Sequence, residues 1–217
     1  MLELTNISKH YRKGSTIFTA LDNISLKVDK GNFIVITGPS GSGKSTLLYV
    51  IGGMINPDSG NVRYKGKSIY DLNNREKNDY RKEQIGFVFQ QFHLMPFLTV
   101  KENIRLACHG RSRVDMIDSF IEKCSLMSVR DKFPSELSVG EKQRTAFVRA
   151  IIGSPDLLLA DEPTGNLDPE NSEIIMQLMD DFHKNGGTIL LVSHNPGAAK
   201  YACKQIILNK GKISDNK

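Results

Sequence analysis

Alternating apolar and polar positions dominate the beginning of the chain and predict β-strands. Residues 2–11 and 18–28 alternate between the two kinds of side chain, which is typical of strands with one buried face. Short apolar runs occupy residues 33–38 and 85–90, and both indicate buried strands. A helix is expected after the first of these runs, from Lys44 to about Gly52.

The pattern changes in the middle of the chain and changes back near its end. From Thr99 to about Lys132, apolar residues recur at intervals of three and four, which favours helices. After Pro134, strands and helices alternate again. The predicted helices are 138–152, 169–184 and a short one near 196–202, and the predicted strands are 155–163, 188–194 and a terminal hairpin within 205–214. This alternation indicates a mainly parallel sheet with helices on both faces.

These elements combine into one predicted domain that spans residues 1–217. Its fold class is α/β, a mainly parallel sheet preceded by an N-terminal antiparallel β region. Residues 1–90 and 135–217 are expected to form the core together, and residues from about 91 to 134 a small all-helical lobe. A chain of 217 residues can bury a substantial core without disulfides or metal ions.

Composition and charge narrow the class of protein only modestly. Hydrophobic residues make up 39% and charged residues 24%, which is typical of a globular protein. The net charge is +5, but basic and acidic residues are interleaved, so no nucleic-acid partner is expected. The chain has no apolar run long enough to span a bilayer and no signal-peptide pattern. Three widely spaced cysteines indicate reduced thiols in a cytoplasmic protein, with no structural metal.

A glycine-rich segment after the predicted strand 33–38 carries the first candidate chemistry. Its sequence GPSGSGKS matches the pattern GxxxxGK[ST] in the strand-to-helix setting that phosphate binding requires. Backbone N–H groups of such a loop cradle phosphates, Lys44 supplies a cation, and the Ser45 hydroxyl supplies a ligand for Mg²⁺. The predicted contacts of a nucleoside triphosphate are Gly38, Pro39, Ser40, Gly41, Ser42, Gly43, Lys44, Ser45 and Thr46.

Two adjacent acidic residues follow another predicted buried strand. Asp161 and Glu162 come directly after LLLA at 157–160, and ligands of parallel sheets collect at the carboxyl ends of the strands. Asp161 suits an Mg²⁺ site as an oxygen ligand that acts through water. Glu162 is placed to orient or deprotonate an attacking water. Alone, such a pair is more often a solvated acidic turn, and the phosphate-binding loop favours the catalytic interpretation.

Five short motifs follow one another in a fixed order along the chain. They are the phosphate-binding loop at 38–45, Gln90 after IGFVF, LSVGE at 137–141, DEPTGNLD at 161–168, and SH at 193–194. This ordered set resembles ATP-binding-cassette (ABC) ATPase subunits over essentially the whole chain. The stretches IGFVFQQFHLMPFLTVKEN and LLLADEPTGNLD resemble the branch of macrolide-export and lipoprotein-release ATPases.

The resemblance implies that ATP and Mg²⁺ are the ligands and that two subunits pair head to tail. Each ATP would then lie between the phosphate-binding loop of one subunit and Ser138 and Gly140 of the other. Ser138 and Glu141 are also spaced as a capping box, so they can simply begin a well-capped helix. The two roles are compatible, because an uncovered helix N-terminus attracts anions. Asp168 would couple the two ATP sites across the dimer.

Three further residues take roles from the same resemblance. Gln90 matches the residue that links Mg²⁺ and the attacking water to the membrane partner, His194 one that contacts the γ-phosphate, and Tyr11 an aromatic that stacks on adenine. Taken singly, Gln90 would usually be only a polar cap of a strand and His194 more often a structural histidine, and Tyr11 could equally be a core aromatic. The predicted catalytic residues are therefore Glu162 and His194, and the predicted Mg²⁺ ligands are Ser45, Gln90 and Asp161.

The chain departs from the family pattern at the start of the predicted helix 138–152. Two adjacent glycines are usual there, but the first position is Val139, and Glu141 replaces a commoner glutamine. A β-branched side chain restricts the backbone and adds bulk where the partner's triphosphate would approach. We therefore expect Val139 to weaken ATP-driven closure of the dimer without abolishing hydrolysis.

A dense apolar stretch follows Gln90. Residues 92–98 read FHLMPFL, and they can pack in the interior between the core and the helical lobe. The resemblance favours a second interpretation, in which an apolar groove beside the nucleotide site holds a helix of a membrane-spanning permease. The predicted permease contacts are Phe92, Leu94, Met95 and Phe97.

The sequence thus predicts the ATP-hydrolysing subunit of an ABC transporter, a homodimer at the cytoplasmic face of the cell membrane. It would energise a separate permease for lipoprotein release or for peptide or drug export. A regulatory ABC ATPase that signals through a membrane partner without transport is an alternative that the sequence leaves open. A soluble ABC ATPase acting on nucleic acid or the ribosome is a second alternative. Such proteins usually carry a second cassette, a coiled-coil insertion or zinc-binding cysteines, which this sequence lacks.

Overall fold

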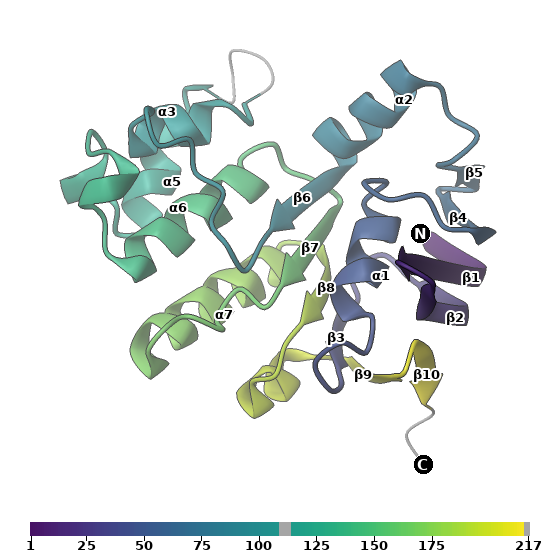
Figure 1. Cartoon of the computed structure of the whole chain (residues 1–217). Helices are drawn as coiled ribbons and strands as arrows, with labels where there is room; N and C mark the ends of the chain where they lie inside the picture. The colour runs from purple at the N-terminus through teal and green to yellow at the C-terminus, as the bar shows by residue number, and fades with distance from the viewer. Residues whose placement is uncertain (109–113, 215–217) are drawn as a thin grey trace.

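The computed structural model describes residues 1–108 and 114–214, which form two β-sheets with helices packed on them (Figure 1). The first sheet is antiparallel and has the strand order β2-β1-β4-β5. Its strands are β1 (Leu2–Lys13), β2 (Thr16–Val28), β4 (Ser59–Tyr64) and β5 (Lys67–Ser68). Burial alternates along the second half of β2, because one face of this sheet is covered and the other is solvated.

The second sheet is mainly parallel and has the strand order β10-β9-β3-β8-β7-β6. Its strands are β3 (Phe33–Thr37), β6 (Ile85–Val88), β7 (Leu157–Asp161), β8 (Thr188–Val192), β9 (Lys204–Asn209) and β10 (Lys212–Ser214). The short strand β10 runs antiparallel to β9 and completes the predicted terminal hairpin. Every residue of β7 and β8 is buried, as expected for strands covered on both faces.

Helices cover both faces of the second sheet. Ile34 and Ile36 of β3 share an apolar core with α1 (Lys44–Ile51) and with the first sheet. Phe33 and Val35 point the other way and share a core with α6 (Val139–Ile151) and α7 (Pro169–Lys184). The predicted α/β fold, with an N-terminal antiparallel β region, is confirmed.

A third apolar cluster holds the helical part of the molecule together, on the left in Figure 1. Most of it comes from α3 (Val100–Arg105), α5 (Ile117–Lys123) and the residues that follow α5. Val148 and Ile152 at the end of α6 complete the cluster, so the helical lobe packs on a helix of the core. The predicted lobe limits of about 91 and 134 stay a prediction, and residues 109–113 of that segment lie outside the described residues.

The remaining helical elements are short. They are α2 (Asn74–Asp79), a π-helical turn (Tyr80–Gln84) and three 3₁₀ turns (Met127–Val129, Pro134–Glu136 and Pro196–Tyr201). Across the two described ranges, no helix combines the length and the apolar character that crossing a bilayer needs.

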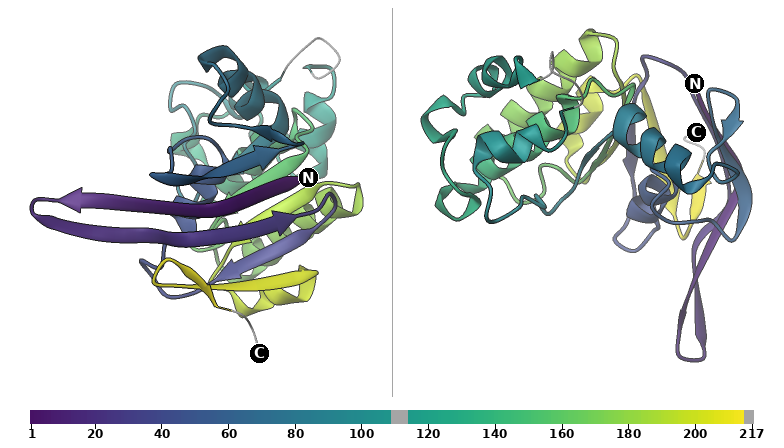
Figure 2. Two further views of the ribbon diagram at one scale, coloured as in Figure 1. Left: turned by 90° about the vertical axis from the view of Figure 1, so that its right-hand side faces the viewer. Right: turned by 90° about the horizontal axis from the view of Figure 1, so that it is seen from above.

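Strands β1 and β2 form a long hairpin whose tip projects from the rest of the molecule (Figure 2). The structure continues both strands beyond the predicted limits, up to the turn at Gly14. Tyr11 and Phe18 face each other across the hairpin, and they are 39% and 52% exposed. Two aromatic side chains therefore stand in register near the hairpin tip.

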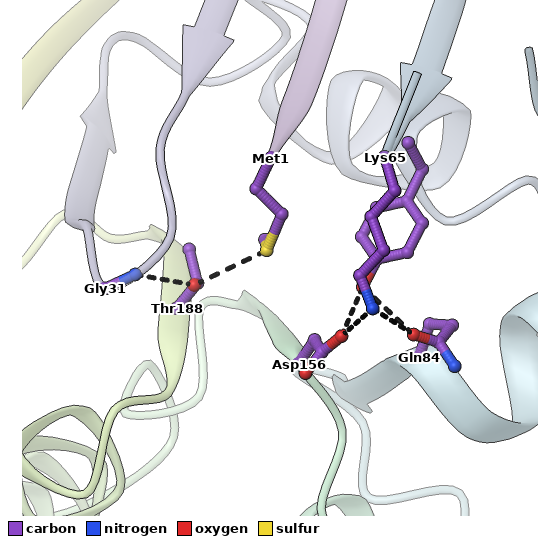
Figure 3. Close-up of polar contacts among 7 residues, drawn as sticks. Met1, Gly31, Lys65, Gln84, Asp156 and Thr188 are labelled. Carbon is purple, nitrogen blue, oxygen red and sulfur yellow. Dashed lines mark hydrogen bonds and ion pairs between the residues drawn. The ribbon is translucent and has the colours of Figure 1, made fainter. Parts of the chain in front are cut away.

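A polar contact joins the two sheets at the amino end of β7 (Figure 3). Oδ2 of Asp156, the residue before β7, accepts hydrogen bonds from Lys65 Nζ at 2.5 Å and from the Tyr64 hydroxyl at 2.7 Å. Lys65 also donates to Gln84 Oε1 at 3.1 Å. The hydrogen bond from Lys65 is the main reason that the pKa of Asp156 lies below its ordinary value. This contact anchors the first sheet at the end of β7 opposite Asp161.

Candidate nucleotide site

The loop between β3 and α1 has a backbone that only glycine can adopt at two positions. Gly38 has φ +143° and Gly43 has φ +103°. A Cβ at Gly38 would overlap the carbonyl oxygen of Leu208, and one at Gly43 would overlap that of Ala20. Gly43 is also the N-cap of α1, so the loop leads directly to the unpaired N–H groups of the first helical turn. This arrangement is an anion-binding cradle.

Lys44 folds back over this loop. Its ammonium donates to the carbonyl oxygens of Gly38 and Pro39, both at 2.9 Å, and the residue is only 5% exposed. Burial lowers the pKa of Lys44, while the nearby carboxylates of Glu162 and Asp161 oppose that shift. An ammonium with three N–H donors holds the loop in shape with two of them and keeps one for a phosphate oxygen.

Asp161 ends β7 and accepts hydrogen bonds on both carboxylate oxygens. Ser45 Oγ donates to Oδ1 at 2.9 Å, and the Tyr49 hydroxyl donates to Oδ2 at 3.1 Å. Asp161 is 5% exposed, so these two bonds replace most of its hydration. Burial and the neighbouring Asp161 raise the pKa of Tyr49 to about 12.

Glu162 and His194 form a pair beside Asp161. His194 Nε2 lies 2.9 Å from Glu162 Oε1, and the two side chains are 48% and 22% exposed respectively. Glu162 has φ +47°, a left-handed conformation that is uncommon outside glycine. Its N–H donates to the carbonyl of Val192 at 2.9 Å, which anchors this backbone on β8. The turn after β7 therefore directs the Glu162 side chain toward His194, which follows β8.

One cavity of about 360 Å³ brings most of the sequence-predicted residues together. Its walls include Tyr11 from the hairpin, Gln90 after β6, and the Glu162–His194 pair. The phosphate-binding loop and the start of α1 contribute Ser40, Gly41, Ser42, Gly43, Lys44, Ser45 and Thr46. The predicted base-stacking residue, the phosphate cradle and the predicted catalytic pair thus share one space.

Six residues predicted for the nucleotide site do not line this cavity. Gly38, Pro39 and Asp161 are hydrogen-bonded to lining residues. Ser138, Gly140 and Asp168 lie at the N-termini of two other helices. Ser138 caps α6 in a capping box with Glu141, and Asp168 caps α7 through the N–H of Asn171 at 2.8 Å. The hydrogen bond from the Asn171 N–H keeps the pKa of Asp168 below its ordinary value.

Asn171 also explains why residue 140, in the motif LSVGE at 137–141, is a glycine. A Cβ at Gly140 would overlap the Asn171 carboxamide, whose oxygen accepts from Arg144 at 2.8 Å. Val139, one residue earlier, is 45% exposed and can therefore be larger.

Sequence reasoning missed two residues of the site. Tyr49 follows Ser45 by four residues, a helical spacing that places both side chains on one face of α1 and could have revealed it. Phe18 lines the cavity with Tyr11, and only the register of the hairpin shows that the two residues are opposite each other.

The oxygen atoms around Ser45 suit a hard divalent cation. The Ser45 hydroxyl and the Asp161 carboxylate are adjacent, and the Gln90 side chain lines the same cavity. Groups of three or more His, Cys, Asp or Glu residues that could hold a metal ion are absent from residues 1–108 and 114–214.

This fold and this site define a nucleotide-binding protein of the P-loop class. A sequence profile of the ABC transporter family matches residues 21–165. The match covers more than half of the chain, so the chain belongs to the ABC transporter family, and its class is that of the ABC ATPases.

Individual relatives agree with this assignment. The macrolide export ATP-binding/permease protein MacB of Chlorobaculum tepidum is 40% identical over 100% of this chain, which spans only 34% of that protein. The uncharacterised ABC transporter ATP-binding protein YknY of Bacillus subtilis is 39% identical, over 98% of this chain and 95% of YknY. The resemblance to the macrolide-export branch is thereby confirmed.

A solved structure has the same architecture. It is the dimeric ATP-binding cassette MJ0796 in a post-hydrolysis state with ADP and Pi, and MJ0796 comes from Methanocaldococcus jannaschii. The TM-score is 0.93 at 36% identity, with 100% of this chain and 98% of that chain covered. The fold of this protein is therefore that of an ABC cassette.

Proposed function

We propose that the cavity binds ATP together with Mg²⁺ and that the residues around it hydrolyse the γ-phosphate. The observation that carries this proposal is the convergence of three groups at the carboxyl ends of neighbouring parallel strands. Lys44 follows β3, Asp161 and Glu162 follow or end β7, and His194 follows β8. Ligands of open α/β sheets bind at this edge.

Separate residues hold the phosphates and the metal in this proposal. The loop N–H groups and Lys44 bind the phosphate oxygens, and Ser45, Asp161 and Gln90 hold Mg²⁺, with Asp161 acting through water. The 2.9 Å contact between Ser45 Oγ and Asp161 Oδ1 supports this set, because it places two hard oxygen donors side by side. When bound, Mg²⁺ neutralises charge on the phosphate oxygens.

The Glu162–His194 pair supplies the chemistry in this proposal. Glu162 accepts a hydrogen bond from the attacking water and takes its proton as the water attacks the γ-phosphorus in line. The bond from the γ-phosphorus to the oxygen that bridges it to the β-phosphate breaks, and ADP leaves with that oxygen. His194 donates to the γ-phosphate oxygens and stabilises their charge. The 2.9 Å separation of the two side chains supports a shared role, because one ligand can touch both. Positioning and electrostatics then supply most of the rate acceleration.

A homodimer would complete the site. Ser138 and Gly140 lie outside the cavity wall, at the N-terminus of α6, where Ser138 is exposed and Gly140 is buried. The exposed first turn of this helix can meet the triphosphate bound to a second subunit. The dimeric structures of MJ0796 support this arrangement. Asp168, which begins α7 near the same place, would couple the two sites.

A membrane permease is the proposed partner of the dimer, with the ATPase at the cytoplasmic face of the membrane. Phe97 is 70% exposed and Met95 is 41% exposed, so both can contact another protein. Phe92 is half-buried, and Leu94 packs against the third apolar cluster. These two side chains would therefore lie beneath the exposed contact surface. The permease segment of MacB supports such a partner. The cargo would be a lipoprotein, peptide or drug.

The hydrolysis proposal is tested by replacing Glu162 with glutamine and measuring phosphate release from ATP. Loss of the general base should lower the rate about 100-fold or more, while ATP binding persists. Glu122→Gln is the matched control, because Glu122 is an exposed glutamate of the helical lobe and should leave the rate unchanged. A Glu162→Gln rate equal to that of the parent protein would contradict the proposal.

The permease proposal is tested by Phe97→Ser in cells that produce the complete complex. Copurification of a membrane protein with the parent chain should be lost with Phe97→Ser, and the variant should stay soluble because Phe97 is largely exposed. An insoluble variant would instead show that Phe97 belongs to the core.

A further inference from the structure

Tyr49 lies on α1, where its hydroxyl contacts Asp161 and its ring lies beside Phe87 of β6 and Phe89. Its hydroxyl donates to Asp161 Oδ2 at 3.1 Å, whereas Ser45 occupies Oδ1. Both donors come from one face of α1, one turn apart, so the carboxylate is held from two directions. Rotation of the Asp161 side chain would break at least one of these bonds.

A bound Mg²⁺–nucleotide would affect the two hydrogen bonds to Asp161 differently. In the proposed function, the Ser45 hydroxyl would serve as a ligand of Mg²⁺ and could no longer hold Oδ1 of Asp161. The Tyr49 hydroxyl has no role at the metal, so its hydrogen bond to Oδ2 would persist. Tyr49 would then fix the orientation of Asp161, which is proposed to act on Mg²⁺ through water.

The ring of Tyr49 belongs to a row of aromatic side chains that leads away from the cavity. Its centroid lies 5.7 Å from that of Phe87 and 6.4 Å from that of Phe89. Phe87 and Phe89 are stacked at 4.2 Å, and Phe89 meets the His93 ring edge-on at 4.8 Å. These are contact distances for aromatic pairs, so the row is continuous.

The far end of this row is the wall of a second cavity. Phe87, Phe89 and His93 line a space of about 420 Å³ between the core and the helical lobe. Arg149 of α6 also lines this space and donates to the carbonyl of His93 at 2.7 Å and to that of Phe92 at 2.8 Å. Gln90 directly follows Phe89, so a shift of the Phe89 backbone also moves a residue of the nucleotide cavity.

We propose that Tyr49 is a positioning residue that orients Asp161 through its hydroxyl and links Asp161 through its ring to the cavity lined by Phe87, Phe89 and His93. The proposal rests on the proposed function, because the orientation of Asp161 has a consequence only at a site for Mg²⁺ and nucleotide. Two independent features carry it: the hydrogen bond to Oδ2 and the unbroken row of rings.

The hydroxyl is tested with Tyr49→Phe, which removes one oxygen and keeps the ring. The matched control is Tyr80→Phe, because the Tyr80 hydroxyl donates to the Ile51 carbonyl of the same helix at 2.9 Å and touches neither acid. Loss of a hydrogen bond to a charged group should lower kcat of Tyr49→Phe about tenfold with KM for ATP nearly unchanged. Tyr80→Phe should keep the parent kcat.

A binding measurement without turnover separates positioning from folding. Calorimetric titration with ADP, with and without Mg²⁺, gives the factor by which the metal tightens binding. Tyr49→Phe should reduce this factor and leave ADP affinity without Mg²⁺ unchanged, and Tyr80→Phe should alter neither. If Tyr49→Phe behaves as Tyr80→Phe does in both assays, the positioning role is wrong. If the parent itself hydrolyses no ATP, the proposed function fails instead.

The ring is tested through the NMR signals of the His93 imidazole, assigned with a His93→Gln variant. Adding Mg²⁺ and ADP should shift these signals in the parent and in Tyr80→Phe. Tyr49→Leu interrupts the row and should abolish most of the shift. An undiminished shift in Tyr49→Leu would overturn the link. If that variant fails to fold, Phe89→Leu interrupts the same row one ring further on. It too should abolish most of the His93 shift, and an undiminished shift would overturn the link.

Discussion

Replacing Val139 with glycine should slightly destabilise this protein and strengthen its ATP-driven dimerisation. Val139 is the first residue of α6, directly after the N-cap Ser138, and it is 45% exposed. Its isopropyl group stands beside the helix N-terminus that is proposed to meet the partner's triphosphate. A glycine would remove that bulk and leave the capping box between Ser138 and Glu141 intact, because both of its bonds use other residues.

The cost in stability follows from the partial burial of Val139. Complete burial of an apolar side chain of this kind stabilises a fold by about 1.5–3 kcal/mol, so a half-buried valine contributes about 1 kcal/mol. Glycine is a poorer helix former than valine by roughly 0.3 kcal/mol. The combined loss of about 1 kcal/mol is small compared with about 5–15 kcal/mol for a typical domain. Val139→Gly should therefore remain folded.

The neighbouring residue provides the contrast for this experiment. Gly140→Ala puts a Cβ into the Asn171 carboxamide and should disturb the starts of both α6 and α7. Dimerisation is measured by size-exclusion chromatography with ATP in the Glu162→Gln background, which slows hydrolysis. Val139→Gly should shift the equilibrium toward dimer, and Gly140→Ala should shift it toward monomer. No gain of dimer and no gain of turnover in Val139→Gly would refute the reasoning.

Three further predictions concern other parts of the molecule. Asp156→Asn should lower stability at pH 7. Because the pKa of Asp156 is depressed in the folded protein, its contribution is fully present above the unfolded value of about 3.9 and is lost as pH falls through the lower folded value. The difference in Tm between parent and variant should therefore begin to shrink near about pH 4 and vanish only below the depressed pKa of the folded protein. Thr99→Ala removes the capping box of α3 and should lower the free energy of unfolding by about 1 kcal/mol in urea titrations, with ATP turnover retained. Tyr11→Leu and Phe18→Leu should each raise KM for ATP, up to about tenfold, with kcat unchanged if both rings contact the base. An unchanged KM in Phe18→Leu would leave Tyr11 as the base contact.

Local pattern was sufficient for most secondary structure and for the phosphate-binding loop. The positions of β3, α1 and β7 follow from apolar runs and from a glycine-rich turn, and both are properties of adjacent residues. The loop was predictable because its backbone excludes other residues: Gly38 and Gly43 have no room for a Cβ and adopt positive φ. A backbone that only glycine can adopt requires glycine at fixed positions, and this pattern can be recognised in the sequence.

The limits of the helical lobe were harder to predict, because its core is not built from one segment. The third apolar cluster includes Val148 of α6 and Ile152 directly after it, and α6 also packs on the main sheet through Phe147. Apolar periodicity shows that a helix has a buried face, but it does not identify what covers that face. For the same reason the sequence left two interpretations of residues 92–98, interior packing and a permease contact. In the structure, Leu94 packs inward and Phe97 is exposed to solvent.

By itself, the sequence determined the α/β fold, the phosphate-binding loop, the acidic pair and the family to which the chain belongs. Only the tertiary structure decided which side chains meet: that Tyr49 shares Asp161 with Ser45, that Glu162 faces His194, and that Asn171 fills the space beside Gly140. The reason is physical. Motifs record what each segment requires of its own backbone, whereas a contact depends on how strands far apart in the sequence are brought into register within one sheet.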